Sequence, residues 1–231
     1  MKILGIIGGV GPESTVEYYR SIISVYRERT GDGSYPPLLV NSIDLKKEIE
    51  MVERDELTAL TLYIAEEVER LARAGAQLAL IASNTPHIVF DEVARRTTLP
   101  LLSIVETACA ETKRRRRKRV ALLGTRYTMT GSFYPKVFTR EGIELVIPNA
   151  DDQDFVHHKY MNELVQGKFL PETRGKLLGI IERMADEKGI DSVLLAGTEL
   201  PLILKEEAHR AIPLIDTIRV HTAAAVAEML N

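Results

Sequence analysis

Short runs of consecutive apolar residues alternate along the chain with longer segments in which apolar residues recur every three or four positions. The short runs predict buried strands, which in the first half of the chain are residues 2–7, 36–43, 77–82 and 100–104. The longer segments predict amphipathic helices at residues 13–29 and 56–75. Apolar strands that are separated by helices indicate a parallel sheet covered on both faces.

The second half of the chain repeats this order. Three segments of the second half resemble segments of the first: RVALLG (119–124) resembles LGIIG (4–8), KGIDSVLLAGTELP (188–201) resembles AGAQLALIASNTPH (74–87), and AIPLIDT (211–217) resembles TLPLLSI (98–104). The glycine or proline that anchors each pair is repeated after 116, 114 and 113 residues, respectively. Three anchors in the same order at nearly one spacing indicate an internal duplication.

The predicted fold class is therefore α/β, with two similar parallel-sheet half-domains that are related by pseudo-two-fold symmetry and have a cleft between them. The expected half-domains are residues 1–112 and 113–231, with a C-terminal helix that can pack back on the first of them. The second half is expected to contain a longer loop at residues 148–159 and two helical stretches on either side of residue 170.

Composition narrows the class of protein. The 231 residues are 45% hydrophobic and 27% charged, which is ordinary for a soluble globular protein, and the net charge of −3 provides no general attraction to nucleic acid or anionic lipid. No apolar run approaches the roughly 20 residues that span a bilayer. Cys109 is the only cysteine, so an internal disulfide and a cysteine metal cage are excluded. The start of the chain does not resemble a signal peptide, and we expect a cytoplasmic protein.

Polar residues gather where two equivalent predicted strands end. SNTPH (83–87) follows the strand at 77–82, and the repeat aligns Gly197, Thr198 and Glu199 with its first three residues. Open α/β sheets bind ligands at the carboxyl ends of their strands, where backbone amides and helix N-termini converge. Two such clusters would place one group on each face of a small substrate.

Each of these residues also has a structural interpretation. Ser83 is either a helix N-cap or a weak acid and ligand donor, and His87 is either a satisfied core histidine or the nearest base. Thr198 and Glu199 either cap and complement the following helix, or take part in binding and acid–base chemistry. Asn84 and Thr85 offer the amide and hydroxyl donors that suit a carboxylate.

Two glycine loops follow the first strand of each half. GGVGPES (8–14) resembles a dinucleotide-binding loop, but Ser14 stands where the third glycine belongs, so an anion-binding loop is the better interpretation. GTRYTMT (124–130) is its counterpart, in which we expect Arg126 to face solvent.

Two other features have simpler explanations. The basic run KRRRRKR (113–119) contains no aromatic residues and is expected to complement the end of a helix, so no nucleic-acid partner is predicted. His157 and His158 are adjacent and lack a third ligand at a diagnostic spacing, so no metal is predicted.

Together, IGGVGPESTVEYY, SNTPH, LLGTRYTMTGSFY, NELVQGKF, GTELPLIL and PLIDTIRVHTAAAV resemble the aspartate/glutamate racemase family over nearly the whole chain. The resemblance implies two α/β domains that face each other, often in a homodimer, and catalysis without pyridoxal phosphate or another cofactor. It also implies that one cysteine from each domain exchanges the Cα proton of an acidic amino acid. The substrate-binding residues that it implies are Val10, Gly11, Lys47, Asn84, Thr85, Thr125, Thr128 and Thr198, and Lys168 is a further candidate for contact with a distal carboxylate.

The sequence departs from the family at both proton-transfer positions. Ser83 and Gly197 stand where the cysteines belong, and Cys109 lies in a predicted helix that matches neither site. A thiol with a pKa of about 8.5 is partly ionised near neutral pH, a serine hydroxyl needs an activating base, and glycine has no proton to exchange.

Three functions remain open: a racemase that uses substitute groups such as Glu199 or His87, a one-sided isomerase, decarboxylase or lyase acting on a small carboxylate, and a catalytically silent binding protein. All three imply a small amino acid or a mono- or dicarboxylate as ligand. Aspartate or glutamate racemisation by the two-cysteine route is expected to be weak or absent.

Overall fold

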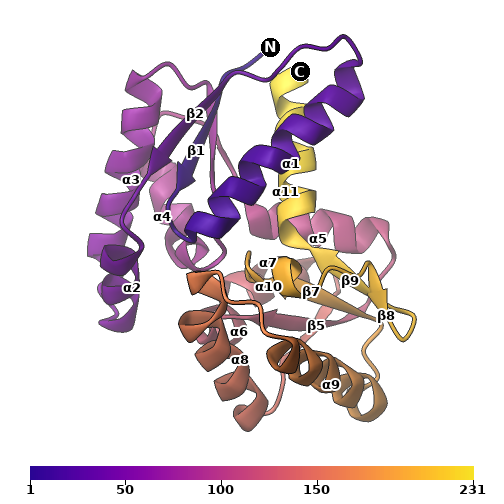
Figure 1. The fold of residues 1–231 in the computed structure, drawn as a ribbon. Helices are drawn as coiled ribbons and strands as arrows, with labels where there is room; N and C mark the ends of the chain where they lie inside the picture. Colours follow the sequence, from indigo (N-terminus) through magenta and orange to yellow (C-terminus); the bar gives the residue numbers. More distant parts are fainter. The chain divides into compact units, whose positions relative to one another are not determined.

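The computed structural model describes residues 1–231, and the chain forms two compact units (Figure 1). Unit 1 consists of Met1–Ile104 together with His221–Asn231, and unit 2 consists of Val105–Val220. The division lies directly after Ile104, the first residue of the helix α5 (Ile104–Arg114). α5 belongs to unit 2 because its side chains contact α7 (Phe133–Arg140) and the residue that follows it, as in the ion pairs Glu106–Arg140 and Lys113–Glu141.

Unit 1 is a four-stranded parallel sheet in the order β2-β1-β3-β4. Its strands are β1 (Leu4–Gly8), β2 (Leu38–Ser42), β3 (Leu78–Ile81) and β4 (Leu101–Leu102). Its helices are α1 (Pro12–Thr30), α2 (Leu45–Glu53), α3 (Leu57–Arg73), the 3₁₀ helix η1 (Thr85–Val89) and α4 (Phe90–Arg96).

The central strands of unit 1 are buried on both faces. α3 covers one face of the sheet, and α1 covers the other beside the end of α11 (Thr217–Leu230), as Figure 1 shows. α1 and α11 are joined by hydrogen bonds from Tyr18 to His221 and between Ser21 and Thr222. Continuous apolar runs in β1 and β3 are the consequence of this double cover.

Unit 2 contains a five-stranded sheet in the order β6-β5-β7-β9-β8, in which only β8 is antiparallel. Its strands are β5 (Arg119–Gly124), β6 (Glu144–Val146), β7 (Ser192–Ala196), β8 (Ala208–His209) and β9 (Ile212–Asp216). Besides α5, α7 and the start of α11, its helices are α6 (Arg126–Thr130), α8 (Ala150–Asn162), η2 (Leu164–Gln166), α9 (Pro171–Lys188) and α10 (Leu200–Ile203).

The two units share one topology, which confirms the predicted fold class of two similar parallel-sheet α/β half-domains. The order β2-β1-β3-β4 in unit 1 corresponds strand by strand to β6-β5-β7-β9 in unit 2. In unit 2, alternate residues of β5 and β7 pack against α8 and α9 in one hydrophobic core, as expected for side chains that point to one face of a strand. None of the helices is both long and apolar enough to cross a membrane.

The prediction of a long loop at residues 148–159 is wrong, because residues 150–162 form α8. Asn149 begins the helix, and its side-chain oxygen accepts a 2.9 Å hydrogen bond from the backbone N–H of Asp152. Asp151 and Asp152 in the first turn complement the helix dipole. The apolar pattern was weak because only Val156 and Tyr160 of this helix are fully buried.

Candidate functional site

The unit 1 part of the candidate site lies where β1 and β3 end. Ile7 pairs with Ile81, so the loops that follow these two strands leave the same edge of the sheet. Gly9 and Gly11 have φ angles of 80° and 104°, and a Cβ on Gly9 would lie 2.3 Å from the backbone oxygen of Ile43. Only glycine fits there, which explains the first glycine loop.

A single threonine holds the glycine loop. Thr15 Oγ1 accepts a 2.9 Å hydrogen bond from the N–H of Gly9 and donates a 3.0 Å bond to the carbonyl of Gly11. Val10, a predicted binding residue, is 2% exposed, and Gly11 is buried. The loop is therefore a fixed turn that leads directly into α1.

The predicted cluster of Ser83, Asn84 and Thr85 lies between β3 and η1. Ser83 is 9% exposed and Asn84 3%, while Thr85 is half-buried. The carbonyl of Asn84 accepts a 3.0 Å hydrogen bond from the N–H of His87. The cluster therefore presents an amide and two hydroxyls at the carboxyl end of a buried strand.

His87 is buried and neutral. Its Nε2 accepts a 3.1 Å hydrogen bond from the N–H of Ile104, which places the ring proton on Nδ1, near the carbonyl of Ser83 but without a regular hydrogen bond. Burial, and then the nearby His221, lower the pKa of His87 to about 3. The ring also stacks on Phe90 at 4.9 Å. Since its lone pair is already used, the geometry favours the structural interpretation of His87 over the catalytic one.

The side-chain contact that Lys47 makes is with Tyr63, and not with a residue of the strand-end cluster. Lys47 is exposed on α2, and its Nζ lies 4.0 Å from the centre of the Tyr63 ring, a cation–π contact. Tyr63 in turn accepts a 3.3 Å hydrogen bond from the N–H of Asp44, the N-cap residue of α2.

The unit 2 part of the site lies where β5 and β7 end. Gly124 pairs with Ala196, and a Cβ on Gly124 would lie 2.5 Å from the Ala196 carbonyl oxygen. Thr125 is the N-cap of α6, and its hydroxyl lies 3.2 Å from that of Thr128. Both threonines are buried, so the structure brings two predicted hydroxyls together at this edge.

Thr198 and Glu199 form a buried polar group with a residue that sequence analysis missed. Glu199 is 1% exposed, and its Oε2 accepts hydrogen bonds from Thr198 Oγ1 at 3.0 Å and from the hydroxyl of Tyr160. Burial, and then Glu199, raise the pKa of Tyr160 well above its usual value of 10.0. Tyr160 was missed because it belongs to α8, of which residues 150–159 were assigned to a loop.

Gly197 has no room for a side chain. A Cβ at this position would lie 2.5 Å from Cε2 and 3.1 Å from Cζ of Tyr160. At a carbon–carbon distance of 2.5 Å, either the Tyr160 ring or the backbone at residue 197 would have to move. The ring of Tyr160 therefore occupies the space that a side chain at residue 197 would need.

The remaining candidate residues are exposed or bond to a neighbouring side chain. Arg126 is exposed and bonds to Asp154, and Lys168 is exposed and bonds to Gln166. His157 accepts from the N–H of Arg126. No group of three or more His, Cys, Asp or Glu residues is placed to hold a metal ion.

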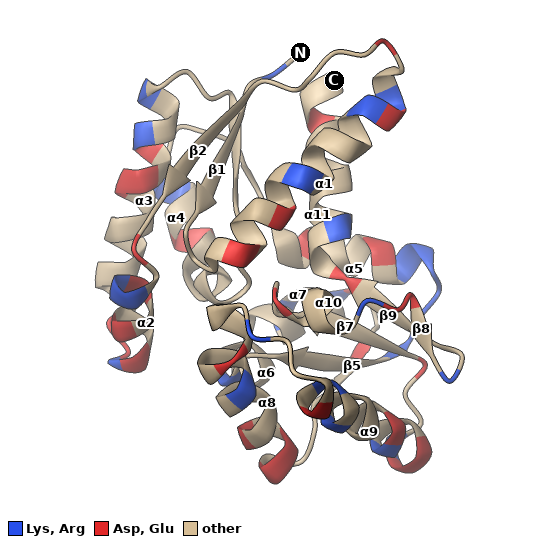
Figure 2. Ribbon diagram, viewed as in Figure 1, with Lys and Arg blue, Asp and Glu red and all other residues tan.

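The basic run at residues 113–119 is largely paired. Lys113 bonds to Glu141, and Arg114 and Arg115 both bond to Glu111 on the preceding turn of α5. Figure 2 shows these basic residues at the end of α5, next to acidic residues of the same helix. Cys109, in the middle of α5, is 2% exposed, and burial raises the pKa of its thiol to about 11.

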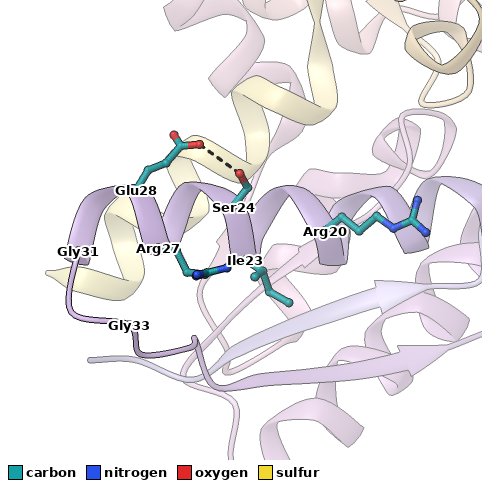
Figure 3. Close-up of a pocket in the computed structure, with 7 residues that line it drawn as sticks. All are labelled: Arg20, Ile23, Ser24, Arg27, Glu28, Gly31 and Gly33. Atoms are coloured by element: carbon teal, nitrogen blue, oxygen red, sulfur yellow. Dashed lines mark hydrogen bonds between the residues drawn. The ribbon is translucent and has the colours of Figure 1, made fainter.

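Two surface cavities do not contain the predicted site. One, of about 620 Å³, lies along the second half of α1, where Arg20, Ser24 and Arg27 line it (Figure 3). The other, of about 460 Å³, lies between the start of α9 and α10 and is lined by Phe169, Arg174 and Lys205, among others. Neither is lined by a residue of the strand-end clusters.

Comparison with known proteins gives matches over most of the chain. The sequence model of the family Asp/Glu/Hydantoin racemase matches residues 7–225. The broad specificity amino-acid racemase RacX of Bacillus subtilis (strain 168) is 24% identical over 219 residues, which cover 93% of this chain and 92% of RacX.

Solved structures of racemases and racemase homologues have a similar fold. A putative Asp/Glu racemase from Yersinia pestis is similar with a TM-score of 0.88 and 28% identity, and PH1733, an aspartate racemase homologue from Pyrococcus horikoshii OT3, with a TM-score of 0.83 and 33% identity. Both alignments cover 100% of this chain and 100% of the other. With the repeated α/β topology, the polar strand ends and the match over residues 7–225, the chain belongs to the Asp/Glu/Hydantoin racemase family.

Proposed function

We propose that this protein binds a small amino acid or a mono- or dicarboxylate through polar groups at its strand ends, without a cofactor, and does not racemise it by the two-cysteine route. The observation that carries the proposal is a contrast at the strand ends. The binding groups are kept as buried hydroxyls and an amide at Asn84, Thr125, Thr128 and Thr198, while residues 83 and 197 carry no thiol.

The serine is a poor replacement for a cysteine in this environment. A serine hydroxyl becomes a base only when an adjacent acceptor takes its proton. His87 is the nearest imidazole in sequence, but its Nε2 is engaged by the Ile104 N–H and its pKa is lowered to about 3 by burial. Ser83 is therefore better suited to donating a hydrogen bond than to removing a Cα proton.

A one-sided reaction on a small carboxylate is the second candidate. It is favoured by Glu199, a carboxylate that is 1% exposed and lies beside the buried hydroxyl of Thr198. Such a reaction needs one acid–base group, whereas racemisation needs one on each face of the substrate.

Hydrogen exchange in D₂O tests this proposal. The protein, without added pyridoxal phosphate, is incubated with L-aspartate, L-glutamate and a panel of neutral amino acids, because RacX is named as a broad specificity racemase. We expect that no α-deuterated D-isomer appears. We also expect that at least one ligand raises the Tm of the protein. Rapid deuterium incorporation with appearance of the D-isomer would contradict the proposal, while exchange without inversion would select the one-sided reaction.

Variants connect binding to the strand ends. Asn84→Ala and Thr128→Val should abolish or strongly reduce ligand stabilisation, because each removes one buried donor. Ser24→Ala is the matched control, since Ser24 is an exposed hydroxyl on α1 that bonds only to Glu28 at 3.1 Å. Equal ligand stabilisation in all three variants would place the binding site elsewhere.

A further inference from the structure

We propose that Tyr160 takes the place of the side chain at residue 197 and closes the second proton-transfer position of the family. This inference rests on the proposed function and names the residue that prevents two-sided proton exchange. The juxtaposition that carries it lies within unit 2: the Tyr160 ring is 2.5 Å from where a Cβ on Gly197 would lie.

The ring cannot move aside at low cost. Tyr160 is 6% exposed and belongs to the hydrophobic core that α8 and α9 form against β5 and β7. Its hydroxyl donates to Glu199, which is itself buried. Rotating the ring away would open a cavity in the core and take one of two recorded donors from a buried carboxylate oxygen.

The phenol does not replace the missing thiol as a base. Its hydroxyl donates to Glu199, and burial keeps its pKa well above the usual range, so no phenolate forms near neutral pH. In two-base exchange, one group removes the Cα proton from one face, and a second group delivers a proton to the other face. With Tyr160 in the space at residue 197, no side chain is available there to deliver the second proton.

A stability cycle tests the geometry without reference to function. Gly197→Ala is measured in three backgrounds: the natural chain, Tyr160→Phe, which keeps the ring, and Tyr160→Leu, which removes Cε2 and Cζ. We expect Gly197→Ala to lower the Tm by roughly 2–10 °C in the first two backgrounds and much less in the third.

Gly175→Ala is the matched control, because a Cβ on Gly175 in α9 meets no atom within 4 Å. This variant should not lower the Tm, because alanine has a higher helix propensity than glycine. If Tyr160→Leu does not fold, comparing the Tm changes of Gly197→Ala and Gly175→Ala still shows whether the space at residue 197 is filled. An unchanged Tm for Gly197→Ala in the natural chain would overturn the proposal, as would an equal loss in all three backgrounds.

The functional arm compares proton exchange with inversion. Ser83→Cys alone should allow α-deuterium incorporation without the D-isomer, and adding Gly197→Cys should not produce inversion while Tyr160 is present. The D-isomer should appear only when Tyr160→Leu is combined with both cysteines. Racemisation by Ser83→Cys/Gly197→Cys with Tyr160 intact would overturn the role of Tyr160. If no variant exchanges protons or binds ligand, the proposed function fails, and the stability cycle decides separately on Tyr160.

Discussion

One carboxyl and two imidazole side chains of unit 1 are buried without an ion pair: Glu48, His87 and His221. Glu48 is 2% exposed, its Oε1 has no hydrogen-bond partner, and burial raises its pKa to about 8. Burial lowers the pKa of His221 to about 4, and the ring accepts from Tyr18 and donates to the carbonyl of Leu102. All three are uncharged in the native protein at pH 7. The burial of Glu48 and His221 could not be predicted from the sequence, because burial of a single side chain is not visible in a residue pattern.

At the residue scale, Glu48→Gln should stabilise the protein increasingly as pH rises from 4.5 to 8. The native carboxyl has a pKa of about 8 against 4.5 when unfolded, so unfolding releases its proton in this range and the native state becomes less favourable. The difference in unfolding free energy between variant and natural chain should grow by about 1.4 kcal/mol per pH unit. Urea unfolding at several pH values measures it, with the exposed Glu53→Gln on the same helix as control.

A pH-independent difference for Glu48→Gln would mean that the carboxyl is ionised in the native state. In that case a cation or water would have to satisfy the oxygen that has no partner in the structure.

At the scale of elements, most of the strands and long helices could be predicted, and the exceptions have physical reasons. Residues 13–29 and 56–75 match α1 (Pro12–Thr30) and α3 (Leu57–Arg73) because a helix in contact with a sheet needs a continuous apolar stripe. α2 and β6 were not predicted, since they are short segments of nine and three residues. α8 was assigned to a loop because its polar first turns lack such a stripe.

Asn149→Ala should destabilise the protein by about 1 kcal/mol, because it removes the side-chain acceptor that begins α8. Asn149→Asp keeps an acceptor and should retain most of the stability. The midpoint of urea unfolding at constant m-value measures both. If the aspartate variant loses as much as the alanine variant, the cap contributes nothing and α8 is held by the core contacts of Val156 and Tyr160 alone.

At the scale of the whole molecule, the fold followed from the sequence more completely than the site did. The duplication is visible in the sequence because both halves contain the same three glycine or proline anchors in the same order. The order of the strands along the chain is therefore the same in both halves, and their sheets share one topology. The polar strand ends could also be located. What the sequence could not reveal is the side chain that fills the space at residue 197, because Tyr160 is 37 residues away along the chain. The contact depends on how α8 packs on the sheet, which no local pattern encodes.

The buried groups together should give a stability maximum near pH 6.5. Between pH 4.5 and 6.5 the unfolded chain binds two protons, on His87 and His221, and the native chain binds one, on Glu48, so stability rises with pH. Between pH 6.5 and 8 only native Glu48 still holds its proton, so stability falls as pH rises. Unfolding free energies from pH 4.5 to 8 measure the curve, and a maximum above pH 8 would contradict it.

The burial of Cys109 has a practical consequence. Thiol-dependent enzymes are poisoned by peroxide and alkylating agents, whereas the single sulfhydryl of this chain is shielded inside unit 2 and resists ionisation. The protein should therefore tolerate oxidising conditions that inactivate enzymes with a catalytic thiol.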